Sequence, residues 1–194
     1  KIRLAIFNKH FKKLYSKSNK VEKEFNLKEF VRKCEKNIST HINNLVILFN
    51  SKKLLSIDFC YKRKFNNEEF SKKNYQELKK EILQLIQINY PNYEILETLN
   101  LNVSLDHQKF KDIPQKIKVK NLIIEFKFLC MDKIEFHNLI NKFKKENLNV
   151  LKIYFNSYLK SINYCKQFEK KKILFFLDIG WEKSCLNIIQ NEKL

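Results

Sequence analysis

Apolar side chains recur at helical spacing in three segments of the chain, starting at residues 27, 74 and 133. In the first, residues 27–40, the repeat is i, i+3, i+4, i+7 and i+11. Each segment has a capping residue and a glutamate three positions later, as a helix start requires. The three pairs are Asn26 and Glu29, Asn74 and Glu77, and Asp132 and Glu135. The pattern therefore predicts three amphipathic helices, with inward stripes at Leu27, Phe30, Val31, Cys34, Ile38; Tyr75, Leu78, Ile82, Leu85, Ile86; and Phe136, Leu139, Ile140, Phe143.

Strand patterns occupy most of the remaining chain. Residues 44–50 (NLVILFN) form a continuous apolar run between polar residues, which predicts a strand buried on both faces. Residues 93–105 alternate between apolar and polar positions, interrupted only at Glu97, which predicts a strand with one buried face and one solvent-exposed face. Further strands are expected at residues 1–7, 53–64, 119–130, 150–155, 173–177 and 185–189, with a loop at 106–118 and a short helix at 156–165. Asn147 stands where a helix ends on a left-handed residue.

Strands and helices alternate at both ends of the chain, around a middle section with a cleanly alternating strand. This order predicts an α/β layer interrupted by a small inserted α+β unit.

Charge is high but evenly spread. The 194-residue chain has 39 basic and 21 acidic residues, a net charge of +18. Residues 1–97 hold 21 basic and 11 acidic residues (net +10), and residues 98–194 hold 18 and 10 (net +8). A nucleic-acid-binding surface gathers basic residues on one face, so this even spread favours a solvated surface and argues against nucleic-acid binding.

The cysteines and histidines are widely separated in the sequence, which favours reduced thiols in the core and no zinc site. No apolar run approaches the roughly 18–20 residues that span a bilayer.

The only glycine of the chain, Gly180, lies between two apolar runs in ILFFLDIGWEKSCLNII. A turn with Asp178 at its entry and Ser184 at its exit is suited to holding a phosphate with main-chain N–H groups. The aspartate could hold a magnesium ion directly or through its waters. The alternative from spacing alone is a plain hairpin whose turn needs one positive φ angle.

The segment DIGWEKSCLNI resembles the phosphate-binding hairpin of the actin, Hsp70 and FtsA superfamily of ATPases, and the order of segments before it resembles bacterial cell-division protein FtsA. In that family a strand is followed by an inserted subdomain, a helix, a long strand and an "Asp-x-Gln … Ile-x-x-Pro" stretch. Here these parts are matched by NLVILFNSKKL, YQELKKEILQLI and EILETLNLNVSLDHQKFKDIP. The chain then returns to the main sheet through NLIIEFKFL, EFHNLINKFKKENLNVLKIYF and NSYLKSINY before the hairpin.

The resemblance implies an actin-like (ribonuclease H-like) ATPase subdomain with a small inserted α+β subdomain. Residues 1–50 and 118–166 would form the first actin-like subdomain, with Val46 and Ile124 in one sheet. Residues 51–117 would form the inserted subdomain, and 167–194 the start of a second. The implied phosphate site consists of Asp178, Gly180, Trp181, Glu182 and Ser184, with ATP as ligand and Mg²⁺ at Asp178 through water. Trp181 and Glu182 depart from the glycines usual in FtsA.

The resemblance further implies a cytoplasmic protein, peripheral on the inner face of the cell membrane, that tethers the FtsZ ring. It would be at most a weak ATPase. Its partners would be FtsZ, other division proteins, copies of itself in actin-like polymers, and the membrane through a C-terminal segment beyond this piece of the chain. Two alternatives stay open. One is a PilM-like pilus-assembly protein, which shares the hairpin and the actin-like fold, and the other is a basic RNA-binding or ribosome-associated protein.

Overall fold

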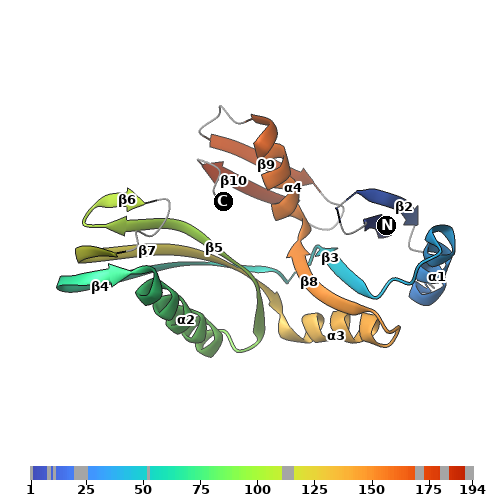
Figure 1. Ribbon diagram of the computed structural model, residues 1–194, viewed down its shortest axis with the longest axis horizontal. Coiled ribbons are helices and arrows are strands. Elements are labelled where there is room, and N and C mark those ends of the chain that lie inside the picture. Colours follow the sequence, from blue (N-terminus) through green and yellow to red (C-terminus); the bar gives the residue numbers. More distant parts are fainter. Residues whose placement is uncertain are drawn as a thin grey trace. The chain divides into compact units, whose positions relative to one another are not determined.

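The structure is a computed structural model that describes residues 2–7, 10, 12–19, 26–51, 53–110, 116–168, 173–179 and 184–190. The fold is mixed α/β (Figure 1). Its helices are α1 (Leu27–Ile38), α2 (Lys72–Asn89), α3 (Lys133–Lys144), α4 (Asn156–Cys165) and the 3₁₀ turn η1 (Lys166–Phe168). Its strands are β1 (Ile2–Phe7), β2 (Lys13–Asn19), β3 (Asn44–Phe49), β4 (Leu55–Ser71), β5 (Tyr93–Leu105), β6 (Gln108–Phe110), β7 (Lys116–Asp132), β8 (Asn149–Phe155), β9 (Ile173–Ile179) and β10 (Ser184–Gln190).

The chain divides into two compact units. The first comprises Lys1–Val46 and Leu139–Lys152, and contains the antiparallel β1–β2 hairpin and α1. The second comprises Ile47–Asn138 and Ile153–Leu194, and contains the largest sheet, α2, α4 and the β9–β10 hairpin.

A four-stranded sheet with the order β4-β7-β5-β6 forms the centre of the second unit, and each neighbouring pair is antiparallel. β4 and β5 therefore run in the same direction with β7 between them, and α2 connects them as a split β-α-β unit. α2 lies along one face of the sheet (Figure 1).

The hydrophobic core lies between α2 and this face of the sheet. The helix contributes Tyr75, Leu78, Ile82 and Ile86, spaced so that all lie on one stripe. β7 contributes alternate residues, including Phe126 and Phe128, whose rings stack at 5.8 Å between centroids. This arrangement explains why β7 is so apolar, because it is the central strand that both β4 and β5 flank.

Two of the three predicted helix starts are confirmed, and the third is displaced. The Glu29 N–H donates to Asn26 Oδ1 at 3.0 Å, and the Glu135 N–H donates to Asp132 Oδ1 at 3.0 Å. α2 starts earlier than expected, with Ser71 as its N-cap instead of Asn74.

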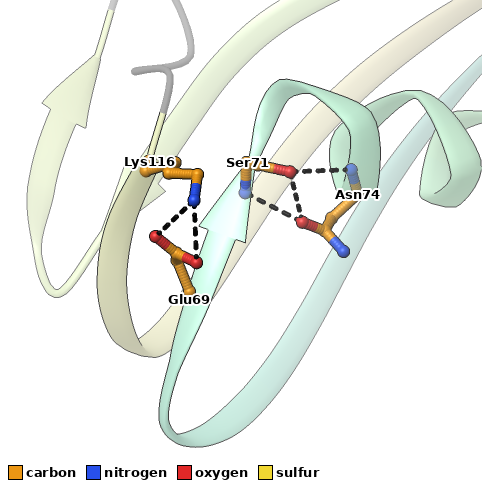
Figure 2. A network of polar contacts seen from close by, with 4 residues as sticks. All are labelled: Glu69, Ser71, Asn74 and Lys116. Atoms are coloured by element: carbon orange, nitrogen blue, oxygen red, sulfur yellow. Dashed lines mark hydrogen bonds and ion pairs between the residues drawn. The ribbon is translucent and has the colours of Figure 1, made fainter.

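Asn74 is instead the third residue of α2 and closes a reciprocal capping box with Ser71 (Figure 2). The Asn74 N–H donates to Ser71 Oγ at 3.4 Å, and the Ser71 N–H donates to Asn74 Oδ1 at 3.0 Å. An asparagine oxygen can accept the bond that a glutamate usually takes, which is why a search for glutamate alone misplaced the cap.

The predicted left-handed residue at the end of α3 is confirmed, because Asn147 has a φ of 56°. The hairpin at the end of the chain is also confirmed, with each strand two residues longer than expected. The predicted loop at 106–118 is partly wrong, because residues 108–110 form β6 and β7 begins at Lys116.

Strand pairing differs from the expected subdomain plan. Val46 lies in β3, which pairs with β8, whereas Ile124 lies in β7 of the four-stranded sheet, so the expectation that they share a sheet is wrong. β7 pairs with β4 from Lys116 opposite Ser71 to Cys130 opposite Leu55. The predicted boundary between residues 117 and 118 therefore falls inside one continuous strand.

The prediction that β3 is buried on both faces is also wrong. Its residues alternate between exposed and half-buried, and Val46 and Leu48 are each 55% exposed. A continuous apolar run fits either a doubly covered strand or a strand with one open apolar face, and periodicity alone does not separate the two.

Candidate functional site: the β9–β10 hairpin

The hairpin that carries the predicted phosphate loop is a regular antiparallel pair. Its register runs from Ile173 opposite Gln190 to Ile179 opposite Ser184, without a bulge. The turn between the strands, which contains Gly180, Trp181 and Glu182, lies outside the described residues. The predicted roles of those three residues therefore stay predictions.

Asp178 lies near the end of β9 and forms an ion pair with α4. The Lys160 ammonium is 3.2 Å from each oxygen of the Asp178 carboxylate. The Asp178 side chain is only 21% exposed and that of Lys160 is 45% exposed. The site thus holds a half-buried carboxylate and a cation next to the turn.

Ser184 begins β10 and is exposed. It is paired with Ile179, whereas Asp178 is paired with Cys185 in the next row. Successive residues of a strand point to opposite faces, so the Asp178 and Ser184 side chains lie on opposite faces of the hairpin. The backbones of the two residues lie close together next to the turn. Their side chains point to opposite faces, so they do not face one common ligand.

Two polar contacts that the sequence did not single out join the hairpin to α4. Asn187 is buried, and its amide nitrogen donates to Ser157 Oγ at 2.9 Å and to the Ser157 carbonyl at 3.3 Å. Tyr164 of α4 stacks on Phe176 of β9 with ring centroids 5.6 Å apart. The signal available in the sequence was a polar residue inside an apolar strand, CLNII, because such a residue needs a partner when it is buried.

The face of the hairpin away from these contacts is apolar and exposed. The prediction that ILFFL is a buried strand is therefore wrong for the described residues: Phe175 is 69% exposed and Leu177 58% exposed. The apolar face consists of Ile173, Phe175, Leu177, Ile179, Leu186 and Ile188.

The described residues supply one carboxylate, Asp178, to the predicted magnesium site, and that carboxylate already binds Lys160. Within the described part of the chain, no three His, Cys, Asp or Glu side chains lie close enough together to hold a metal ion. A magnesium ion requires near-octahedral oxygen ligands and keeps several waters. The described residues alone do not build such a site.

Burial changes the acidity of groups around the hairpin and the sheet. Tyr158 of α4 is half-buried, and burial followed by the negative charge of Glu97 on β5 raises its pKa to about 12. Burial followed by the charge of Glu94 raises the pKa of the Cys130 thiol to about 11. Both groups are therefore neutral near pH 7 and are not nucleophiles.

The five cysteines are free, as predicted, but Cys60 is exposed, so the expectation that all five are core thiols is wrong. No helix in the described part of the chain is both long and apolar enough to cross a bilayer.

Comparisons with known proteins give no family: no protein-family model and no curated protein matches the chain.

Proposed function

We propose that the chain is an FtsA-like, actin-like protein of bacterial cell division, which links the FtsZ ring to the cytoplasmic membrane. The observation that carries the proposal is the order of elements. A small sheet with one helix is inserted between β3 and α3, and α3, β8 and α4 lead directly into a hairpin with Asp178 at the end of its first strand. The order of helices and strands along the chain is the one that the resemblance to FtsA implies, although NLIIEFKFL pairs with β4 and β5 of the inserted sheet instead of returning to a main sheet.

Several local features support the same proposal. The inserted part has the split β-α-β arrangement of β4, α2 and β5 around β7. The corner after α3 has a left-handed residue, Asn147, where the family has a glycine corner. The hairpin strands are joined to the preceding helix, α4, by Asn187 and by Asp178.

In this role the turn of the hairpin would contact the phosphates of ATP, and the protein would work mainly as a nucleotide-binding scaffold. Its partners would be FtsZ, other division proteins, the membrane and further copies of itself. The finer part of the fold, an actin-like subdomain, belongs to the same proposal.

The test has a cellular and a biochemical arm. A fluorescent fusion to the complete protein, expressed in its own organism, should form a ring at the division site, and depletion should leave cells that grow without dividing. Diffuse fluorescence together with normal division on depletion would refute the proposal. Localisation at a pilus base would favour the PilM-like alternative instead.

The biochemical arm uses the only glycine. At Gly180 a β-carbon would occupy space that phosphate oxygens need and would disfavour a positive φ angle. Gly180→Ala in the complete protein should weaken ATP binding, measured by calorimetry, while a compatible backbone limits the loss of folding stability to about 1 kcal/mol or less. If the melting temperature falls while the ATP affinity is unchanged, the glycine serves the turn alone.

A further inference from the structure

The outer face of the four-stranded sheet, opposite α2, changes in charge along its length. Near the ends of β4 and β7 that adjoin α3, three of its charged residues have polar partners: Lys127 lies 2.7 Å from Asp58, and the Asn102 amide donates to Glu125 at 2.5 Å. The end of this face that lies away from α3 differs. It carries five exposed lysines, which we call the basic sheet face: Lys62, Lys64, Lys109, Lys118 and Lys120.

The register shows that these lysines share one face. Lys62 is opposite Ile123, Ile123 is opposite Ser104, and Ser104 is opposite Lys109, so one row crosses all four strands from Lys62 to Lys109. With strands about 4.8 Å apart, the two ends of the row are about 14 Å apart. Lys64 lies two residues further along β4 on the same face.

The β7 lysines lie on this face because their neighbours point the other way. Ile117 and Val119 pack in the core on the α2 side, and side chains alternate along a strand. Lys118, between them, therefore points outward, and Lys120, the residue after Val119, is exposed.

Two acidic residues, Glu69 and Asp106, lie on or beside this face and are outnumbered by its five lysines. Glu69 is directly opposite Lys118 in the strand register. Glu69 is 3.4 Å from Lys116 and forms an ion pair with it (Figure 2). Asp106 accepts the backbone N–H groups of Lys120 and Asn121. None of the five lysines forms an ion pair with a residue in the described ranges. On α2, by contrast, Glu77 and Glu81 are interspersed among the exposed lysines.

We propose that the basic sheet face docks on an anionic lipid surface. Its charge is complementary to such a surface, and its five ammonium groups are spread in two dimensions over three strands, β4, β6 and β7, as contact with a plane requires. Each lysine near an anionic leaflet contributes about 1 kcal/mol, which is a factor of about five in binding. The inference deepens the proposed membrane tether by adding a second contact to lipid, and it rests on that function.

Nucleic acid is disfavoured as the occupant by the side chains on the face. Single strands bind basic sheet surfaces chiefly by stacking their bases on aromatic rings. The residues that lie between the lysines in the strand register, Ile123, Ser104 and Asn121, carry no aromatic ring. Arg63 does not join the lysines, because its guanidinium lies over the Phe65 ring at 5.0 Å.

The experiment measures binding of the 194-residue chain to sedimented vesicles, without any division protein. One set of vesicles mixes phosphatidylglycerol with phosphatidylcholine, and the other is phosphatidylcholine alone. The chain should bind only the anionic set, and less at high salt. The triple variant Lys62→Gln, Lys109→Gln, Lys118→Gln should lose about a hundredfold in affinity, the product of three factors of about five.

A matched triple variant on α2, Lys72→Gln, Lys73→Gln, Lys80→Gln, changes the net charge equally and should lose much less. Equal losses in the two triples, or no binding of the unchanged chain to anionic vesicles, would overturn the proposal. So would tighter binding to RNA that competes with the vesicles. Circular dichroism checks that each variant folds, and Lys109→Gln alone, expected to lose about fivefold, serves if the triple does not fold.

The two proposals fail separately. Vesicle binding that follows the basic sheet face, in a protein absent from the division site, would refute the division role and keep the lipid contact. Division-site localisation without vesicle binding by this chain would refute the lipid contact and keep the role.

Discussion

Tyr158 offers a test of whether α4 and the four-stranded sheet pack as the structure shows. The phenol is half-buried, and burial together with the nearby Glu97 carboxylate raises its pKa from 10.0 to about 12. Both causes disfavour the phenolate. In the unfolded chain Tyr158 loses its proton near pH 10, whereas in the folded protein it keeps the proton until about pH 12.

The sign follows from proton binding. Between these two pKa values the folded state binds more protons than the unfolded state, so the free energy of unfolding falls as pH rises. The contribution of Tyr158 is fully present below pH 10 and is lost as pH passes through about 12. The difference between a pKa of 10.0 and one of about 12 corresponds to about 2.7 kcal/mol, which is an upper bound because the side chain is partly exposed.

The assay compares urea denaturation of the unchanged protein with that of Tyr158→Phe from about pH 8 to about pH 12. Phenylalanine cannot ionise, so the difference in unfolding free energy should change by up to about 2–3 kcal/mol over this range, in favour of the variant at high pH. The two proteins are otherwise identical, so the difference between them isolates the Tyr158 phenol. Parallel curves for Tyr158→Phe and the unchanged protein would refute the packing of Tyr158 near Glu97.

Two further substitutions test buried polar groups. Asn187→Ala removes both hydrogen bonds to Ser157 and should lower the free energy of unfolding by about 2 kcal/mol in urea denaturation. Asn149→Ala, which removes one exposed bond to Asn44, should lower it by less than about 1 kcal/mol, and similar losses in the two variants would contradict the buried anchor. The buried Tyr75 hydroxyl has no hydrogen-bond partner among the described residues. Tyr75→Phe should therefore leave the melting temperature unchanged or raise it, and a clear fall would reveal a partner.

Local signals in the sequence predicted the helix ends well, because a cap depends on residues only three positions apart. Asn26, Asp132 and Asn147 all have the predicted conformations or bonds. The displaced start of α2 has the same local origin. Ser71 and Asn74 form a capping box that differs from the usual serine and glutamate pair only in its second member.

Sheet pairing was not predictable in the same way, because it depends on residues far apart in the chain. β5 has the predicted bounds, yet register shifts near residues 96 and 101 break its alternation, so its odd positions do not all share a face. The separation of β3 from β7 into different sheets leaves no trace in either segment alone. Exposure is equally non-local: the apolar runs in β3 and β9 specify strands but not what covers them.

The same limit applies to the candidate site. A motif search finds Asp178, Gly180 and Ser184, but not Lys160, which reaches Asp178 from another element. The spacing of NSYLKSINYC places Ser157, Lys160 and Ser161 within one turn of α4, and only the fold shows that this turn meets the hairpin.

Lys160 leads to a final prediction about how the hairpin would bind ATP. If Asp178 serves Mg²⁺ through water, the Lys160 ammonium and the hydrated ion compete for the same carboxylate oxygens. Lys160→Met should then strengthen magnesium-dependent ATP binding to the complete protein. The cost in folding stability should stay within about 1 kcal/mol, because the ion pair is partly exposed. Calorimetry with and without Mg²⁺, alongside thermal melting, measures both effects.

The direction of the change separates the roles that Lys160 can have. A higher affinity only in the presence of Mg²⁺ identifies the lysine as a competitor that holds Asp178 in the empty site. A lower affinity with or without Mg²⁺ would contradict this and would mean that the ammonium itself meets the phosphates, since a lysine beside a phosphate acts as a point charge. An unchanged affinity would mean that Asp178 is not part of the ligand site and that the ion pair only links α4 to β9.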